Sequence, residues 1–561
     1  MKPTMESDIP VLRITDLTVQ FSSGRELVTA VRHVSIDVAA GETVAVVGES
    51  GSGKSTTASA INRLLPENGH ITSGSILFGG REITELSENE MMHLRGAGIG
   101  LVPQDPMSNL NPLMRIGDQI AEALEVHDLA RGSHGQARAV ELLDMVGIPD
   151  AAQRARQYPH EFSGGMRQRA LIAMGLACTP RLLIADEPTS ALDVTVQRRI
   201  LDQLDTLTGE MGTAVFLITH DLALAAERAD RIVVMLQGQI VEEGTARQIF
   251  TSPTHEYTRA LLAAAPSLLT ARTAISARSM QSPILERTTA PSRSGDIHPP
   301  LVEVRSLCKT FDLRRPRPGE PRTLTAVDDV SFTIPRGTTV SIVGESGSGK
   351  STVANMMLAL ETITTGSILF DGVDLAALNK RELFAFRRRV QPVFQNPYAS
   401  LDPRYTVEQS IVEPLRVHRV GTTPSRRQRV AELLEQVSMP ASMASRLPHE
   451  LSGGQRQRVA IARALTLEPD LVVLDEAVSA LDVLVQAQIL ELLAELQQRL
   501  GLSYLFISHD LAVVRMISDF VHVMRRGRIV ESGTPEEIFD APQHEYTKEL
   551  LDAIPGSHFV V

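Results

Sequence analysis

The chain has 561 residues, a formal net charge of −12 and no tryptophan. This length is sufficient for about two to four domains with separate cores, and the acidic balance argues against a nucleic-acid-binding surface, which would be basic. Two cysteines, Cys178 and Cys308, exclude a disulfide framework or a four-cysteine cluster and favour a reducing, cytosolic environment. No apolar run approaches the roughly 18 residues of a membrane span, and the N-terminal stretch lacks the apolar core of a signal peptide.

The chain opens with β-type residues from Ile9 to Val19, and short strands and turns are predicted through residue 80. Within this region an apolar run, Val44–Val47, leads into Gly48–Thr56, which reads GESGSGKST. The stretch fits the P-loop pattern G-x-x-x-x-G-K-[ST]. The apolar strand before it and the helix-compatible residues after it are the setting that this pattern requires.

The residue types of the P-loop explain how it would hold a nucleotide. Glycines let the backbone curl so that successive N–H groups point at phosphate oxygens, and the following helix adds its positive N-terminal end. Lys54 can reach the β- and γ-phosphates, and the Ser55 hydroxyl can ligate Mg²⁺. The same nine letters recur later in the chain. The predicted nucleotide-binding residues of the two loops are Gly48, Ser50, Gly51, Gly53, Lys54, Ser55 and Thr56, and Gly344, Ser346, Gly347, Gly349, Lys350, Ser351 and Thr352.

Each half then contains a region rich in helix formers and interrupted by proline, at residues 105–160 and 396–449. Ala137–Val146 and Arg427–Val437 place apolar residues at the i, i+3, i+4 spacing of a helix face. We predict an inserted helical subdomain in each copy.

Apolar runs without polar alternation follow these regions at Leu182–Ala185, Ala214–Ile218, Leu471–Leu474 and Tyr504–Ile507. Such runs are typical of strands buried on both faces of a parallel sheet. Their alternation with helical stretches predicts α/β layering in each half.

The long-range repeat indicates a duplicated domain, the first over residues 9–266 and the second over residues 301–561. Residues 267–300 between them are rich in Ser, Thr, Arg and Pro, and are predicted to form a linker. Residues 314–321 are rich in Arg and Pro and are interpreted as a solvated loop, with contact to lipid headgroups or acidic partners as the alternative.

Further short motifs occur in the same order in both halves. They are the glutamines Gln104 and Gln395, the turns Ser163-Gly164-Gly165 and Ser452-Gly453-Gly454, the pairs Asp186-Glu187 and Asp475-Glu476, the Ser-Ala-Leu-Asp segments 190–193 and 479–482, and His220 and His509. With the P-loops, this set resembles the Q-loop, signature, Walker B, D-loop and switch histidine of the ATP-binding cassette (ABC) family. The resemblance implies two tandem P-loop NTPase domains, each with a RecA-like core, an antiparallel β subdomain and an inserted helical subdomain.

The resemblance also implies a role for each motif. The predicted Mg²⁺ site comprises Asp186, Ser55 and Gln104 in the first half and Asp475, Ser351 and Gln395 in the second. The predicted catalytic residues are Glu187 and Glu476, which would orient and polarise the attacking water, and His220 and His509, which would sense the γ-phosphate. In the family the signature turn contacts ATP on the opposite cassette, which implies that the two halves close head-to-tail on two ATP molecules.

Some positions are weaker or depart from the family pattern. Phe21 and Phe311 lie near the first strand of each half, where the family places an aromatic ring under adenine, and core packing is the alternative for both. Met166 replaces the usual Gln of the signature, and Ala477-Val478 replaces the Pro-Thr pair. Neither change removes a phosphate ligand or a catalytic carboxylate, so two hydrolytic sites are expected, whose relative rates the sequence leaves open.

Two features point to one branch of the family. Both halves carry Q-x-P-x-x-x-L-x-P from Gln104 and Gln395, and both end in His-Glu-Tyr-Thr, at His255–Thr258 and His544–Thr547. The chain thus resembles the dipeptide, oligopeptide and nickel importer ATPases, two of which look fused here. Some relatives hold a cysteine-bound iron–sulfur cluster, and because the cysteines for it are missing none is expected.

The resemblance implies an ATP hydrolase coupled to transmembrane transport, most simply of peptides. It would sit at the cytoplasmic face of the cell membrane, docked on two integral membrane permease subunits and served by an extracytoplasmic substrate-binding protein. The alternative is a soluble twin-cassette ATPase that acts on ribosomes or nucleic acid. Such proteins typically carry a long charged helical linker, whereas residues 267–300 are Pro- and Ser-rich, so we favour the importer without nucleic acid as a partner.

Overall fold

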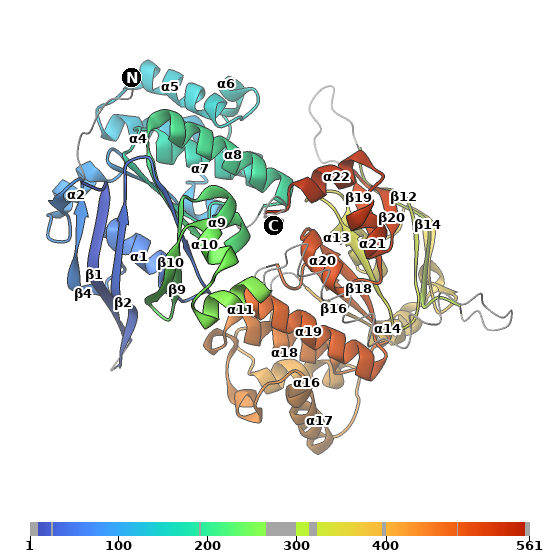
Figure 1. Cartoon of the computed structure of the whole chain (residues 1–561). Coiled ribbons are helices and arrows are strands. Elements are labelled where there is room, and N and C mark those ends of the chain that lie inside the picture. The colour runs from blue at the N-terminus through green and yellow to red at the C-terminus, as the bar shows by residue number, and fades with distance from the viewer. Residues whose placement is uncertain are drawn as a thin grey trace. The chain divides into compact units, whose positions relative to one another are not determined.

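The computed structural model describes residues 9–23, 26–189, 192–264, 299–312, 323–394, 400–479 and 481–555. The chain divides into two compact units, residues 1–265 and 266–561. The first unit is blue to green in Figure 1 and the second is yellow to red. The predicted loop 314–321 and the predicted linker up to residue 298 lie outside the described residues.

The first unit contains two sheets, an antiparallel one of order β2-β1-β4-β5 and a larger one of order β10-β9-β3-β8-β7-β6. In the larger sheet β10 is antiparallel to β9, and the other neighbouring strands pair in parallel. The strands are β1 Leu12–Ser23, β2 Glu26–Val38, β3 Thr43–Val47, β4 Gly69–Phe78, β5 Arg81–Glu82, β6 Ile99–Val102, β7 Leu182–Asp186, β8 Ala214–Thr219, β9 Arg231–Leu236 and β10 Gln239–Gly244. The helices are α1 Lys54–Ile61, α2 Glu88–Leu94, α3 Pro106–Asn109, α4 Ile116–Val126, α5 Gly132–Met145, α6 Ala151–Arg154, η1 Pro159–Glu161, α7 Gly164–Leu176, α8 Val194–Met211, α9 Leu222–Arg228, α10 Ala246–Thr251 and α11 Glu256–Ala264.

The second unit repeats this architecture with sheets of order β12-β11-β14-β15 and β16-β17-β18-β13-β19-β20. Its strands are β11 Val302–Asp312, β12 Thr323–Ile334, β13 Thr339–Val343, β14 Thr365–Phe370, β15 Val373–Asp374, β16 Val390–Val393, β17 Leu471–Asp475, β18 Ser503–Ser508, β19 Phe520–Arg525 and β20 Arg528–Gly533. Its helices are α13 Lys350–Met357, η3 Leu375–Ala377, α14 Lys380–Arg389, α16 Val407–Val417, α17 Thr423–Gln436, η4 Ala441–Ser445, η5 Pro448–Glu450, α18 Gly453–Leu465, α19 Val483–Leu500, α20 Leu511–Ile517, α21 Pro535–Asp540 and α22 Glu545–Asp552.

The central strands place the motifs at one edge of each large sheet. Residues Val44 to Val47 of β3 are fully buried and pair in parallel with β8 and β9. Because β7 and β8 run in the same direction as β3, the P-loop, Asp186 and the residues after Thr219 all follow carboxyl ends of strands. Ligands of open α/β sheets bind at this edge. The apolar runs predicted as buried strands are confirmed as parts of β3, β7 and β8 and their counterparts.

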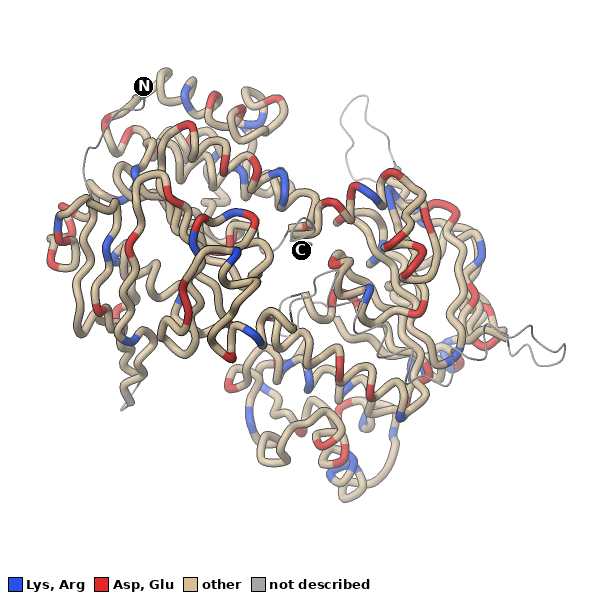
Figure 2. The backbone as a smooth tube through the Cα atoms, viewed as in Figure 1, with Lys and Arg blue, Asp and Glu red and all other residues tan. Residues whose placement is uncertain are grey.

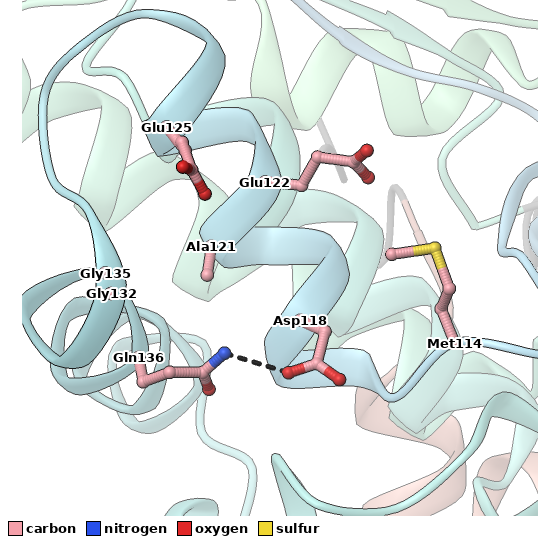
Figure 3. Close-up of a pocket in the computed structure, with 8 residues that line it drawn as sticks. All are labelled: Met114, Asp118, Ala121, Glu122, Glu125, Gly132, Gly135 and Gln136. Carbon is pink, nitrogen blue, oxygen red and sulfur yellow. Dashed lines mark hydrogen bonds between the residues drawn. The ribbon is translucent and has the colours of Figure 1, made fainter.

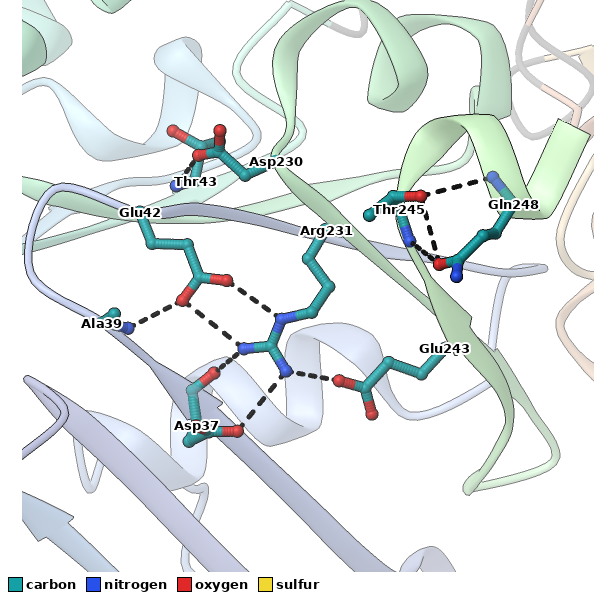
Figure 4. Close-up of polar contacts among 9 residues, drawn as sticks. All are labelled: Asp37, Ala39, Glu42, Thr43, Asp230, Arg231, Glu243, Thr245 and Gln248. Carbon is teal, nitrogen blue, oxygen red and sulfur yellow. Dashed lines mark hydrogen bonds and ion pairs between the residues drawn. The ribbon is translucent and has the colours of Figure 1, made fainter. Parts of the chain in front are cut away.

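A charged cluster fastens the first unit's two sheets to each other (Figure 4). Arg231, the first residue of β9, lies 3.0 Å from Glu42 and 3.4 Å from Asp37, and also contacts Glu243. Asp37 belongs to β2 of the antiparallel sheet, whereas Glu42 precedes β3 and Glu243 lies on β10. The cluster thus fixes the entry to the strand that carries the P-loop.

The second unit has an aromatic contact in a comparable place. The ring of His522 on β19 lies 5.3 Å from that of Phe332 on β12 and 5.1 Å from that of Phe520 on β19. Its Nδ1 is 2.7 Å from Ser532 Oγ on β20, and burial lowers its pKa to about 4. In the first unit an ion pair therefore joins β9 to β2, whereas in the second unit an aromatic contact joins β19 to β12.

The predicted helical subdomains are confirmed in both units. In the first, α4, α5 and α7 pack against one another around buried residues such as Ile120, Leu143 and Leu171. Helix α5 begins at Gly132, whereas the apolar periodicity in the sequence begins at Ala137. The sequence did not indicate the first turn because its residues are mostly polar and exposed. Residues of both charge signs are distributed over the helices of each unit (Figure 2). Among the described helices none combines the length and apolarity needed to cross a bilayer.

Candidate nucleotide site

Each P-loop is shaped by its own glycines and lysine. Gly53 caps α1 with a left-handed φ of 100°, and Gly349 caps α13 with a φ of 106°, a conformation that favours glycine. A Cβ at Gly48 would lie 2.2 Å from the backbone oxygen of Met235, so a side chain there would require the strand to move. The exposed tips of the loops are Ser50-Gly51 and Ser346-Gly347.

The loop lysines point back into their own loops. Lys54 is buried, and its Nζ donates to the carbonyl oxygens of Gly48 at 2.6 Å and Glu49 at 2.8 Å. Lys350 makes the same bonds to Gly344 at 2.6 Å and Glu345 at 2.8 Å. Each ammonium group thus ties the start of the loop to the start of the following helix, where a phosphate group would be held.

Two of the three predicted metal ligands of each unit meet, at the end of β7 in the first unit and of β17 in the second. Ser55 Oγ donates to Asp186 Oδ1 at 3.1 Å, and Ser351 Oγ donates to Asp475 Oδ1 at 3.3 Å. Hydroxyl and carboxylate oxygens are the donors that Mg²⁺ prefers, so these residues fit the ion. Burial, with the neighbouring Glu187 charge, raises the pKa of Asp186 although Ser55 and Lys54 oppose the shift. A divalent cation would favour the ionised form.

The predicted catalytic glutamates adopt an unusual backbone conformation. Glu187 has a φ of 45° and Glu476 a φ of 48°, in the left-handed region that non-glycine residues rarely occupy. Their backbone N–H groups donate to Ile218 and Ile507 at 2.9 Å, which fixes them against the next strand. Strain of this kind is common at functional sites. Here it occurs at residues whose carboxylates lie within 3.4 Å of the predicted switch histidines.

The side chain of Glu187 joins two predicted site residues. Its Oε2 accepts a hydrogen bond from Gln104 Nε2 at 2.8 Å, and its Oε1 lies 3.3 Å from His220 Nδ1. In the second unit Glu476 Oε1 lies 3.4 Å from His509 Nδ1. Gln395, the counterpart of Gln104, lies outside the described residues. Gln104 therefore contacts the carboxylate of Glu187, and its predicted place in the Mg²⁺ site stays a prediction.

The Glu–His pairs are electrostatically coupled. Burial alone would raise the pKa of Glu187, but its hydrogen bond and ion pair with His220, with Lys54 and Gln104, lower that pKa below its ordinary value. Burial would likewise lower the pKa of His220, but Glu187 raises it overall. In the second unit the pKa of Glu476 is lowered in the same way, against burial, by His509 and Lys350. The pKa of the glutamate is thus lowered in both units, and in the first unit the pKa of the partner histidine is raised.

The signature turns begin helices of the helical subdomains. Ser163 caps α7, and its Oγ accepts from the Met166 N–H at 3.3 Å. Ser452 caps α18 in the same way, and there Gln455 also accepts from the Ser452 N–H at 3.0 Å. Met166 lacks an acceptor for the return bond, so the departure from the family pattern removes half of a capping box.

Gly165 and Gly454 have close neighbours on the next long helix. A Cβ at Gly165 would lie 2.7 Å from Val196, and one at Gly454 would lie 2.3 Å from Val485. Glycine thus lets α7 approach α8, and α18 approach α19, while Gly164 and Gly453 have more space.

The predicted adenine-stacking residues stay predictions. Phe21, near the end of β1, is half-buried and packs against the core of the first unit and against Gly69. Phe311 on β11 is also half-buried, and Lys309 Nζ lies 4.9 Å from its ring centroid. Both rings therefore have core or cation contacts in addition to an accessible portion.

A contact that the sequence analysis missed comes from the His-Glu-Tyr-Thr motifs. The Tyr257 hydroxyl accepts a hydrogen bond from the backbone N–H of Glu49 at 2.9 Å, and the Tyr546 hydroxyl accepts one from Glu345 at 3.1 Å. The only sign of this contact in the sequence was that the motif is repeated in both halves. The motif lies about 200 residues from its P-loop, so the sequence does not indicate that the two are in contact.

Sequence comparisons identify the family to which this geometry belongs. The pattern described as ABC transporter matches residues 31–190 and 327–479. The chain belongs to the ABC transporter family. This ABC protein is therefore an ATP-binding subunit whose ATP hydrolysis is coupled to transport, and the predicted family and α/β fold class are confirmed. A second pattern, the C-terminal region of oligopeptide/dipeptide transporters, matches residues 241–292 and 530–558, which include both Tyr257 and Tyr546.

Relatives of this ABC protein match it over nearly its whole length. It is 46% identical over 557 residues to the glutathione import ATP-binding protein GsiA of Salmonella choleraesuis (strain SC-B67), covering 97% of this chain and 89% of the relative. The protein of the same name from Escherichia coli (strain K12) is 46% identical over 562 residues, with the same coverage. A solved dimeric structure of the ATP-binding cassette MJ0796 with ADP and Pi is 30% identical, with a TM-score of 0.38, and the match covers 42% of this chain and 99% of that one.

A separate groove of about 390 Å³ lies on the helical subdomain of the first unit. Figure 3 shows that it lies between α4 and α5, with Asp118, Glu122 and Glu125 on α4 and Gln136 on α5. The Gln136 side chain donates to Asp118 at 2.8 Å. The groove contains none of the P-loop or Walker B residues, so it is a surface distinct from the nucleotide site.

Proposed function

We propose that the chain is the ATP-hydrolysing subunit of an importer of small peptides, in which two ATP molecules bind at head-to-tail composite sites. The observation that carries the proposal is the duplication of the whole constellation: each unit brings Lys, Ser, Asp, Glu and His of its motifs together, as at Lys54, Ser55, Asp186, Glu187 and His220. Each unit also carries a signature turn. Glutathione, the cargo named for the relatives, is the first peptide to test.

In this proposal the residues act in a fixed order. Lys54 and the loop N–H groups would hold the triphosphate, and Asp186 with Ser55 would hold Mg²⁺, which neutralises developing negative charge. Glu187, kept ionised by His220, would orient the attacking water and accept a proton from it as the water attacks the γ-phosphate. The His220 imidazole would then respond to loss of the γ-phosphate. Gln104, bonded to Glu187, would transmit this change to the helical subdomain.

The partners in this proposal are two integral membrane permeases and an extracytoplasmic binding protein, with the chain at the cytoplasmic face of the membrane. The segment that follows Gln104 would be the surface on which a permease docks. Leu113 is 85% exposed and Met107 is 65% exposed, and the acidic residues of α4 lie beside them along the sequence. In this proposal these two exposed apolar side chains would contact a permease.

A cross-linking experiment tests the composite sites. In a chain whose two native cysteines are replaced by serine, Ser50→Cys and Ser452→Cys should be joined by a short bismaleimide only when Mg–ATP is present. The matched control, Ser50→Cys with Ser163→Cys, places both groups in one unit and should not cross-link. Cross-linking of the control pair instead would refute the head-to-tail arrangement.

Co-purification tests the transport role. The tagged chain, expressed with candidate permeases, should retain two polytopic membrane proteins in detergent, and the complex in liposomes should accumulate glutathione or another short peptide at the expense of ATP. Retention of ribosomes in place of membrane proteins would favour the twin-cassette alternative.

A further inference from the structure

The C-terminal extension of each unit is bonded to the nucleotide loop. Tyr257 lies in the first turn of α11, is 8% exposed, and accepts the hydrogen bond from Glu49 described above, across 208 positions of sequence. Tyr546 occupies the same place on α22, is 1% exposed, and bonds Glu345 across 201 positions. The same long-range contact therefore occurs in both copies, although the units differ elsewhere, as at Arg231.

A glutamate on the preceding strand fixes the helix that carries each tyrosine. Glu242 on β10 accepts from the backbone N–H groups of Thr254 at 2.7 Å and His255 at 3.0 Å. These bonds, with the hydroxyls of Thr258 and Thr254, outweigh burial and lower the pKa of Glu242 to about 2. Glu531 on β20 holds the Gln543 and His544 N–H groups in the same way. The tyrosine hydroxyl is thus presented from an anchored helix N-terminus.

The bonded loop residue is also the one that the lysine holds. The N–H of Glu49 donates to Tyr257, and its carbonyl accepts from Lys54 Nζ at 2.8 Å. Glu345 stands between Tyr546 and Lys350 in the same way. A lysine ammonium has three hydrogens to donate, and the loop carbonyls accept two of them. The tyrosine bond would then hold this end of the loop while the lysine turns to the nucleotide.

We propose that Tyr257 and Tyr546 are positioning residues of the two ATP sites, through which each C-terminal extension responds to occupancy of its P-loop. The inference rests on the proposed function, because it requires the P-loops to bind nucleotide. Coupling between two sites is reciprocal. A tyrosine that supports the occupied loop must therefore itself be held more firmly when nucleotide is bound.

The test uses the full chain with Tyr257→Phe or Tyr546→Phe, which keeps the ring and removes only the hydroxyl. Tyr504→Phe is the matched control, because the buried Tyr504 hydroxyl donates to the carbonyl oxygen of Leu493 on α19 at 2.9 Å, within the second unit. Binding of Mg–AMPPNP is measured by calorimetry, and hydrogen exchange of residues 256–264 and 545–552 is measured with and without it.

Tyr257→Phe should weaken nucleotide binding at the first site about 3- to 10-fold, as expected for one lost hydrogen bond. It should abolish the nucleotide-dependent protection of residues 256–264 and leave that of residues 545–552 intact. Tyr546→Phe should give the reverse pattern, so the unaltered unit reports that each variant is folded. Tyr504→Phe should lower the melting temperature without changing affinity or protection.

Two results would overturn the inference in distinguishable ways. Equal affinity and equal protection in wild type and both loop-facing variants would refute the role of the tyrosines and leave the proposed function standing. A wild-type chain that bound no Mg–AMPPNP would refute the proposed function, and the inference with it.

Discussion

Replacing Glu187 by glutamine tests the chemistry of the site with the smallest change of shape. Glutamine can still accept the bond that Gln104 donates to Oε2 at 2.8 Å, but it removes the negative charge that lies 3.3 Å from His220 Nδ1. The substitution leaves in place the bonds from Lys54 to its loop carbonyls. Nucleotide affinity should therefore stay within about 3-fold, while the proton-accepting group is lost, which typically costs about 10²- to 10⁴-fold in rate.

The duplication makes the single and double variants informative. If the two sites turn over independently and equally, Glu187→Gln should leave about half of kcat, whereas Glu187→Gln with Glu476→Gln should lose about 10²- to 10⁴-fold. A much larger loss in either single variant would indicate that the sites are unequal or that they alternate. Steady-state phosphate release with separate ATP-binding measurements provides both quantities.

A titration gives an independent readout of the same pair. Because Glu187 raises the pKa of His220, Glu187→Gln should lower that pKa, as seen in the ¹³C shift of labelled histidine. The pair should stabilise the fold fully between about pH 4.5 and 6.5, the ordinary pKa values of the two groups, and less on either side. A double variant with near-normal turnover and an unchanged His220 pKa would refute the assignment of Glu187 and Glu476 as catalytic bases.

Three further outcomes are expected. Gly344→Ala should abolish nucleotide binding in the second unit, measured by calorimetry, and destabilise that unit by about 1–3 kcal/mol, because its Cβ would lie 2.1 Å from the backbone oxygen of Met524. Met166→Gln should complete the capping box as Gln455 does in the second unit and raise the first unit's stability by about 0.5–1 kcal/mol in thermal unfolding, whereas an unchanged melting temperature would contradict the capping argument. Glu242→Gln should lower the free energy of unfolding above pH 4.5, because the pKa of Glu242 in the folded state lies below the ordinary 4.5. The difference from wild type should shrink as the pH falls towards about 2. A difference that does not depend on pH would contradict a role for the charge.

The sequence alone determined the chemistry of each half and the class of fold. Phosphate binding needs a glycine-rich loop, a lysine and a hydroxyl within nine consecutive residues, so local order reveals it. Buried parallel strands such as β7 and β8 are continuous apolar runs, which are also visible locally. The order of motifs along each half then predicted that Asp186, Glu187 and His220 would follow the carboxyl ends of neighbouring strands.

Only the tertiary structure decided which of these groups touch. The pairing of Glu187 with His220, and the bond that the Glu49 N–H of the P-loop donates to Tyr257, join segments that no short-range pattern relates. The physical reason is that hydrogen bonds and ion pairs need distances of about 3 Å, which are set by how strands and helices pack. The sequence therefore showed that the His-Glu-Tyr-Thr motif is repeated. Only the packing of α11 and α22 showed that its tyrosine contacts the nucleotide loop.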